Sequence, residues 1–216
     1  IQFLMFYIFI MEHNNILPVV LAGGKAKRFG GNKSQAKLKD KILIDYILSE
    51  ILKQFNEVLI VANDPINHLS SHKILKIEDY KKNLGPLGGV VSAMKWIKKN
   101  KKKYQWISTF PSDTPFFKIK IFNEFLRKVN ERESELFFMN SKERRHNIFG
   151  LWSVDLVDQL EKDLENGIRK VEKWANNIGV IGINVSFENE DPFFNINTKE
   201  DLEKAKQILN DKLPSS

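Results

Sequence analysis

The stretch Leu21–Lys33 (LAGGKAKRFGGNK) directly follows the short apolar run Ile16–Val20 (ILPVV). It holds four glycines and four cationic side chains. A buried strand that opens into such a loop offers bare backbone N–H groups and positive charge together, which is what a polyphosphate requires. The loop therefore indicates nucleotide chemistry, and the alternative is a flexible, solvated connection between a strand and a helix.

Two familiar phosphate-binding loops do not fit this stretch. A Walker A loop needs a glycine, four residues and then Gly-Lys-Ser/Thr, but Asn32 precedes the Lys33-Ser34 pair and Lys27 stands where the first glycine belongs. The Gly-x-Gly-x-x-Gly spacing of dinucleotide-binding folds is absent too. The loop therefore belongs to another class of phosphate site.

Composition narrows the class of protein. The chain has 216 residues, of which 42% are hydrophobic and 28% are charged, and such values are ordinary for one globular domain with a sizeable core. We expect that domain to span residues 16–210, with residues 1–15 as a leader outside the fold and 211–216 as a tail. The apolar run Ile1–Ile10 is too short to span a bilayer and lacks the flanks of a signal peptide, so we expect Met11 to be the native start.

Cysteine content and charge restrict location and partners. The chain contains no cysteine, which excludes disulfides and thiolate zinc sites and fits a reducing, cytoplasmic location. Its net charge of +7 favours anionic partners. Because the basic run 98–103 has no interleaved aromatic residues and no known docking motif, we do not expect nucleic acid as a partner. The ordinary globular composition argues against a membrane protein, and we expect no membrane as a partner.

Hydrophobic periodicity predicts strands and helices in alternation along the chain. The predicted strands are 16–21, 58–62, 74–77, 106–110, 136–139, 148–152 and 180–183, and the predicted helices are 42–55, 85–98, 119–130, 154–165, 168–176 and 199–209. Such alternation predicts an α/β fold, a three-layer sandwich in which helices flank a mostly parallel, Rossmann-like sheet.

Polar groups follow four of the predicted strands. Ligands of parallel α/β sheets bind where the carboxyl ends of the strands meet. The candidate groups there are the loop 23–33 after the first strand, 63–65 (NDP) after the second, 78–79 (ED) after the third and 111–115 (PSDTP) after the fourth. Four such strand ends together favour one ligand site over four unrelated loops.

Asp113 is the candidate metal ligand. It lies just past an apolar strand, in a loop that Pro111 and Pro115 stiffen. Mg²⁺ usually takes one or two protein carboxylates and fills its other positions with phosphate oxygens and water, and Mn²⁺ suits the same oxygen ligands. One aspartate opposite a triphosphate loop is therefore sufficient. The alternative is a turn aspartate that caps the following helix.

Asn63 and Asp79 are candidates either for ligand contact or for hydrogen bonds that order their own loops. The segment Gly85–Gly89 (GPLGG) opens a predicted helix. Its small residues would let the backbone approach a ligand at the helix N-terminus, unless they only initiate the helix.

Taken in their order along the chain, these motifs resemble those of the bacterial molybdenum cofactor guanylyltransferases (MobA), which have the nucleotide-diphospho-sugar transferase type of fold. The resemblance covers about residues 18–209. It rests on LAGGK at 21–25 with Arg28, Gly30 and Lys33, on ED at 78–79 followed by GPLGG at 85–89, on PSDTP at 111–115 and on FNINT at 194–198. It implies a magnesium-dependent transfer of GMP from GTP to the terminal phosphate of molybdopterin that carries molybdenum, with release of pyrophosphate.

The resemblance also implies roles for individual residues. By similarity, the nucleotide would be held by the backbone of Leu21, Ala22, Gly23 and Gly24, with Lys33 on phosphate, Asn63 and Asp79 placing the guanosine, and Asp113 binding Mg²⁺. Arg28, Lys33 and Asp113 would be the catalytic residues. A pterin phosphate is already ionised at neutral pH, so alignment and neutralisation of the charge on the leaving pyrophosphate suffice without a general base.

The second half of the chain is expected to receive the pterin. Residues 143–146 (ERRH) resemble the family's segment before a returning strand, and 194–198 matches its late asparagine motif, which implies pterin contacts by Arg144, His146, Asn195 and Asn197. The alternatives are a solvated turn for the arginines, a loop position for the histidine, and capping of the last helix by the asparagines. Cofactor-insertion proteins and apo-molybdoenzymes are further expected partners.

Three positions depart from the family's pattern. Asn32 stands where an aspartate usually precedes the loop lysine, Asn147 stands where a proline commonly follows the histidine, and residues 39–41 are Lys-Asp-Lys rather than Asn-Gly-Lys. None of these changes removes a candidate phosphate or metal ligand.

Other activities of the same fold are alternatives, namely a cytidylyltransferase for the same cofactor and a sugar-phosphate nucleotidyltransferase. Such relatives tend to carry Leu-Ala-Ala-Gly, so the Gly23-Gly24 pair favours guanine, because a smaller side chain lets a purine edge reach the backbone. A nucleotide-binding protein without turnover is disfavoured by Asp113 and Lys33, since a pure binder has less need for a metal ligand at the leaving group.

Overall fold

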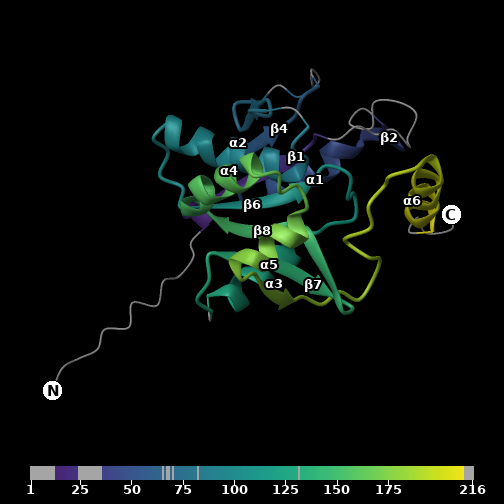
Figure 1. Cartoon of the computed structure of the whole chain (residues 1–216). Coiled ribbons are helices and arrows are strands. Elements are labelled where there is room, and N and C mark those ends of the chain that lie inside the picture. Colours follow the sequence, from purple (N-terminus) through teal and green to yellow (C-terminus); the bar gives the residue numbers. More distant parts are fainter. Residues whose placement is uncertain are drawn as a thin grey trace.

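The computed structural model describes residues 13–23, 36–64, 66, 69, 71–81, 83–130 and 132–211 (Figure 1). Its strands are β1 (Ile16–Leu21), β2 (Lys37–Leu38), β3 (Lys41–Ile42), β4 (Val58–Val61), β5 (Ile74–Ile77), β6 (Trp106–Pro111), β7 (Leu136–Ser141), β8 (Arg144–Ser153) and β9 (Ile181–Asn184). Its α-helices are α1 (Leu43–Ile51), α2 (Pro86–Lys99), α3 (Ile119–Val129), α4 (Val157–Glu165), α5 (Val171–Ile178) and α6 (Lys199–Asn210), and its short 3-10 helices are η1 (His13–Asn15) and η3 (Val154–Leu156).

The main sheet has seven strands in the order β5-β4-β1-β6-β8-β7-β9. Strand β1 pairs in parallel with β4 and with β6, and β4 pairs in parallel with β5. Strand β8 runs antiparallel to both β6 and β7, and β7 pairs in parallel with β9. The predicted mostly parallel α/β sheet is confirmed. Its carboxyl edge brings the ends of β5, β4, β1 and β6 next to one another.

Helices cover both faces of this sheet, as predicted for a three-layer sandwich (Figure 1). Because alternate side chains of a strand point to opposite faces, β1 contributes to two cores. Ile16 and Val20 pack with side chains of α1 and α3, whereas Leu17 and Val19 pack with side chains of α2, α4 and α5. Helix α6 lies to one side, where it packs with the β2–β3 hairpin through a smaller cluster of Leu38, Leu43, Phe116, Ile196 and Ala205.

Several boundaries differ from the predicted ones. Helix α1 ends at Ile51 rather than at residue 55, but the turn that follows keeps Phe55 buried, with its N–H donating to the Ile51 carbonyl at 3.1 Å. Strand β8 begins at Arg144, four residues before the predicted start, because it forms a hairpin with β7. Helix α5 begins at Val171 rather than at residue 168. The short β2–β3 hairpin was not predicted from the pattern of apolar residues.

The two ends of the chain are described in part. Of the expected leader, His13–Asn15 form η1, and the His13 ring lies 5.3 Å from the Phe55 ring. Residues 1–12, which include Met11, and residues 212–216 lie outside the described residues. No helix in the described part has both the length and the apolar character that a membrane span needs.

Candidate active site

Backbone hydrogen bonds continue past the strand ends and hold the candidate loops together. The N–H of Ala22 donates to the Val61 carbonyl at 2.9 Å, and the N–H of Ala62 donates to the Ile77 carbonyl at 3.0 Å. On the other side of β1, the N–H of Ser112 donates to the Leu21 carbonyl at 3.3 Å. The loops after β5, β4, β1 and β6 therefore begin side by side, as the sequence predicts.

Asn63 and Asp79 meet directly in front of Gly23. The Asn63 amide nitrogen donates to Asp79 Oδ2 at 2.8 Å. A Cβ on Gly23 would lie 3.4 Å from Asp79 Oδ2 and 3.7 Å from Asn63 Nδ2. Three strand ends thus place a backbone segment, an amide and a carboxylate within contact of one another, although the residues are distant in sequence.

The other carboxylate oxygen of Asp79 faces the first turn of α2. A Cβ on Gly89 would lie 3.5 Å from Asp79 Oδ1 and only 2.8 Å from Leu21 Cδ2, so a larger residue would not fit without a shift. The glycine lets α2 pack closely against Leu21 and Asp79. Approach of this backbone to a ligand stays a prediction. Burial raises the pKa of Asp79, and the hydrogen bond from Asn63 partly offsets this effect.

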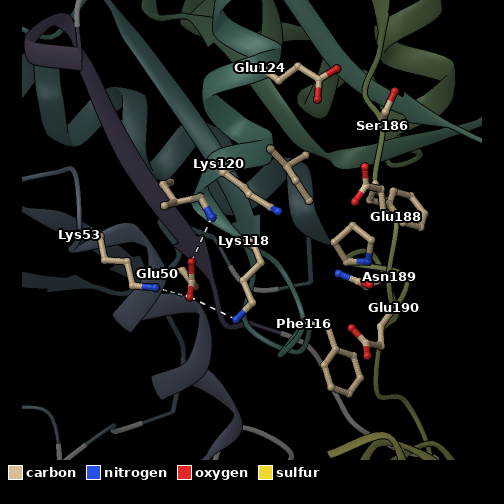
Figure 2. Close-up of a pocket in the computed structure, with 14 residues that line it drawn as sticks. Glu50, Lys53, Phe116, Lys118, Lys120, Glu124, Ser186, Glu188, Asn189 and Glu190 are labelled. Atoms are coloured by element: carbon tan, nitrogen blue, oxygen red, sulfur yellow. Dashed lines mark hydrogen bonds and ion pairs between the residues drawn. The ribbon is translucent and has the colours of Figure 1, made fainter. Parts of the chain in front are cut away.

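Asp113 lies on the opposite side of β1, in the loop after β6. Its carbonyl accepts a hydrogen bond from the Ile196 N–H at 3.0 Å, so the loop that carries the late asparagine motif is joined to it. The alternative of a helix-capping aspartate is excluded for α3, because the N-cap residue is Lys118 and the Ile119 N–H donates instead to Glu50 Oε2 at 3.1 Å. Figure 2 shows Glu50 in this position between α1 and α3.

The donor set at the carboxyl edge suits a hard divalent cation only if a ligand supplies most of the oxygens. Among the described residues, no three His, Cys, Asp or Glu side chains gather closely enough to hold a metal ion by themselves. Asp113 offers one carboxylate, which fits Mg²⁺ or Mn²⁺ when phosphate oxygens and water complete the coordination. The magnesium site at Asp113 stays a prediction from the sequence.

His146 is a buried side chain of β8 rather than a loop residue. It is 9% exposed, its Nε2 lies 2.7 Å from Ser141 Oγ, and its ring stacks on Phe193 with 3.7 Å between centroids. Burial lowers its pKa to about 4, the charge of Arg144 adds to this shift, and Asp191 opposes it. The imidazole is therefore neutral at physiological pH.

The other residues expected on the pterin side lie on the surface. Arg144, Asn195 and Asn197 are exposed. The cap of α6 is Thr198, whose side chain accepts from the Asp201 N–H while Asp201 accepts from the Thr198 N–H, so the asparagine side chains do not fill the N-cap. Arg145 points to other partners, donating to Asn147 Oδ1 at 2.9 Å and lying 3.9 Å from Glu172.

Part of the predicted phosphate loop is not described. Gly24, Arg28, Gly30 and Lys33 all lie outside the described residues, so their predicted roles rest on the sequence. Five of the described candidates form one group at the end of β1 and on its β4 side: Leu21, Ala22, Gly23, Asn63 and Asp79. Asp113 lies on the β6 side of β1.

The structure adds contacts that the motifs did not predict. Buried Ser92 of α2 accepts a hydrogen bond from the Tyr80 N–H, next to Asp79. Phe193 supplies the ring that covers His146. The available signal for Ser92 was its place on the apolar side of the predicted helix, where a polar residue needs a partner.

A separate groove of about 680 Å³ lies between the end of α1, the start of α3 and residues 186–192 (Figure 2). Lys53, Lys118 and Lys120 lie along one wall, and Glu188 and Glu190 along the other. None of the residues predicted for nucleotide or pterin binding lines this groove.

Comparison with known proteins gives the same assignment over most of the chain. A family model described as a MobA-like NTP transferase domain matches residues 18–178. The molybdenum cofactor guanylyltransferase of Haemophilus influenzae is 32% identical over 193 residues, which cover 88% of this chain and 97% of that protein. The molybdenum cofactor guanylyltransferase of Nitrobacter hamburgensis is 27% identical over 193 residues, which cover 88% and 92%.

A solved structure shares the fold. The molybdopterin-guanine dinucleotide biosynthesis protein A of Archaeoglobus fulgidus superposes with a TM-score of 0.74 at 24% identity, covering 90% of this chain and 98% of that one. Its likeness extends across both the parallel part of the sheet and the half that contains β7, β8 and β9, since it covers nearly the whole chain. With the family model matching well over half of its residues, this chain belongs to the family of MobA-like NTP transferases.

Proposed function

We propose that this chain is a molybdenum cofactor guanylyltransferase, which transfers GMP from GTP to the terminal phosphate of molybdopterin that carries molybdenum. The relatives from Haemophilus influenzae and Nitrobacter hamburgensis bear this name, and the similarity extends over nearly their whole lengths. The polar residues Asn63, Asp79 and Asp113 at the described strand ends support this proposal.

The observation that favours GTP over CTP is the Asn63–Asp79 pair in front of Gly23. A carboxylate accepts two neighbouring N–H donors well. Guanine presents such a pair at its N1–H and 2-amino group, whereas cytosine presents only its 4-amino donor on the corresponding edge. Asp79 has one oxygen held by Asn63 and the other over Gly89, so its carboxylate is held beside Gly23. These contacts support our proposal that the base lies against the Gly23 backbone.

The triphosphate would lie toward Asp113 and the loop after β1. We assign phosphate contacts to Lys33 and Arg28 from the sequence pattern, with the backbone of Leu21, Ala22, Gly23 and Gly24 holding the nucleotide. Asp113 would hold Mg²⁺ or Mn²⁺, which when bound neutralises charge on the phosphates. The backbone contact between Asp113 and Ile196 favours a fixed position for this aspartate.

The proposed reaction is one in-line displacement. A terminal phosphate oxygen of molybdopterin forms a bond to the α-phosphorus of GTP, and the bond from that phosphorus to the bridging oxygen breaks. The electron pair leaves with pyrophosphate, and the product contains a new phosphoanhydride. Because the attacking phosphate is already ionised at neutral pH, this chain's residues need to align the reactants and stabilise charge rather than remove a proton.

The acceptor side would use Arg144, Asn195 and Asn197 for direct contacts. These three residues are exposed near the carboxyl edge, in the hairpin and in the loop joined to Asp113 through Ile196. His146 would support this surface as a neutral, stacked ring, because with a pKa of about 4 it carries no positive charge at neutral pH to contact a phosphate.

The experiment that tests the proposal is release of pyrophosphate by the purified protein with GTP, Mg²⁺ and molybdopterin that carries molybdenum, run beside the same assay with CTP. We expect release with GTP that depends on the acceptor. A preference for CTP would identify a cytidylyltransferase instead. Tight binding of GTP without release of pyrophosphate would identify a nucleotide-binding protein without turnover.

A further inference from the structure

Ser92 connects α2 to the loop that carries Asp79. The side chain is 4% exposed, and its hydroxyl donates to the Gly88 carbonyl at 2.7 Å. The same hydroxyl oxygen accepts a hydrogen bond from the Tyr80 N–H at 2.9 Å. The hydroxyl therefore serves two partners, one in its own helix and one in the loop after β5.

The bond to Tyr80 acts on Asp79 because the two residues share a peptide group. That group is planar, so an anchored N–H at Tyr80 also fixes the Asp79 carbonyl and restricts the backbone rotation just after the Asp79 Cα. The direction in which the Asp79 side chain leaves the backbone is then set by α2. Strand β5 ends at Ile77, and within the described part of the chain no ladder hydrogen bond performs this function at Asp79.

The Asp79 carboxylate has little freedom at its other end. Oδ2 accepts from Asn63, and Oδ1 lies over Gly89, which is in the same first turn of α2 as the Gly88 carbonyl that Ser92 holds. The Tyr80 hydroxyl also donates to Glu161 of α4 at 2.8 Å, which fixes the residue after Asp79 on its far side. The backbone after Asp79 and the Asp79 carboxylate are thus both positioned by contacts with the start of α2.

We propose that Ser92 is a positioning residue for nucleotide recognition: its hydroxyl orients the Asp79–Tyr80 peptide so that the Asp79 carboxylate faces the guanosine of GTP. This inference rests on the proposed function. It predicts that loss of the hydroxyl weakens GTP binding through Asp79, while turnover at saturating GTP is retained.

A serine that merely satisfies its own helix would behave differently, and the chain contains one. Ser49 of α1 is exposed, and its hydroxyl donates to the Tyr46 carbonyl at 2.8 Å. No hydrogen bond in the described residues links it to the nucleotide loops. Ser49→Ala is therefore the matched control for Ser92→Ala.

The test measures GTP affinity by calorimetric titration with Mg²⁺, together with steady-state kinetics. For Ser92→Ala we expect the dissociation constant and the KM for GTP to rise roughly tenfold, because the Tyr80 N–H loses its acceptor next to a binding group. We expect kcat and the KM for the molybdenum cofactor to stay within about twofold of the wild type, and Ser49→Ala to change none of these values. A thermal melt of each variant reports whether the fold is intact.

A double-mutant cycle with Asp79→Asn separates positioning from a general loss of order. If Ser92 acts through Asp79, Ser92→Ala weakens GTP binding in the wild type and has little further effect in Asp79→Asn. Two results would overturn the inference: unchanged GTP affinity in Ser92→Ala, or an equal loss in both backgrounds. A wild-type protein that prefers CTP would instead refute the proposed function, so the two failures are distinguishable.

Discussion

The ring of His146 lies flat against the ring of Phe193, with 3.7 Å between centroids and 11° between planes. The two residues come from different elements, one from β8 and one from the loop between β9 and α6. Ser141 meets the imidazole at Nε2, so one face and one edge of the ring are covered by the protein. This packing buries the imidazole and so favours its neutral form.

The depressed pKa of His146 predicts a loss of stability on acidification. The unfolded histidine has a pKa near 6.5 and the folded one about 4, so the unfolded state binds more protons between these values. Stability is fully present above about pH 6.5 and falls as the pH decreases toward 4. We expect the wild type to lose about 2 kcal/mol more unfolding free energy between pH 7 and pH 5 than His146→Gln.

Denaturant unfolding of both proteins at the two pH values measures this difference. An NMR titration of the imidazole gives an independent check, with an expected midpoint near pH 4. A midpoint close to that of a free histidine would contradict the prediction, and so would equal pH dependence of the two proteins.

Asp113 is expected to be needed for turnover and not for folding. Its side chain does not cap α3, so Asp113→Ala leaves the start of that helix intact. We expect pyrophosphate release to fall by about a thousandfold or more, since a metal ligand and its charge stabilisation are lost. Asp158→Ala, which removes an exposed carboxylate 3.3 Å from Lys98, is the control and keeps normal turnover.

Removal of the metal provides a second comparison between the wild type and Asp113→Ala. With excess chelator, the wild type and Asp113→Ala are expected to bind GTP with similar affinity, and added Mg²⁺ is expected to strengthen binding only in the wild type. Near-normal turnover in Asp113→Ala, or equal strengthening of both proteins by Mg²⁺, would refute the assignment.

A methyl group fits at Gly23, but it would change the surface that we propose for the base. A Cβ there would make ordinary contacts of 3.4 Å with Asp79 Oδ2 and 3.7 Å with Asn63 Nδ2. We therefore expect Gly23→Ala to keep its melting temperature and to lose preference for GTP over CTP by about tenfold, because the methyl group covers the backbone beside the carboxylate. Competition between the two nucleotides in the pyrophosphate assay measures the ratio, and a retained preference for GTP would show that Gly23 does not select the base.

The strand ends were predictable because their signal is local. Short apolar runs define β1, β4, β5 and β6, and parallel pairing then brings Asn63 and Asp79 to one edge. The same reasoning placed Asp113 at this carboxyl edge, whereas its position across β1 from Asn63 and Asp79 follows from the strand order of the structure. The 2.8 Å contact between Asn63 and Asp79 confirms that these two strand ends meet.

The half of the sheet that contains β7, β8 and β9 was less predictable, because its strand directions and side-chain contacts depend on residues far apart in the sequence. The apolar pattern of residues 148–152 is the same for either direction of a strand, so the antiparallel course of β8 could not be deduced from it. The turn before β8 uses Lys142 and Glu143 at positive φ, although neither residue type is typical of that conformation, so it carried no turn signal. The environment of His146 depends on Phe193, which lies far away in the sequence, in the loop between β9 and α6.

Glu50 predicts a stability effect away from the active site. Its carboxylate is 6% exposed and accepts from the Ile119 N–H at 3.1 Å, from Lys53 at 2.6 Å and from Lys118 at 3.3 Å (Figure 2). Burial alone would raise its pKa, but the bonds from Lys53 and Ile119 and the charge of Lys118 lower it overall. Its contribution is therefore present above the normal glutamate pKa and is lost as the pH falls through the lower folded value.

Glu50→Ala removes the acceptor at the start of α3, so we expect a loss of about 2 kcal/mol in unfolding free energy at pH 7. Glu50→Gln keeps an oxygen for the Ile119 N–H and should lose about half as much. The control is Glu124→Ala, which breaks the half-buried i,i+4 pair with Lys128 in the same helix and should cost at most about 0.5 kcal/mol. Denaturant unfolding of the three variants measures the order, and equal losses in Glu50→Ala and Glu124→Ala would show that the carboxylate does not anchor α3.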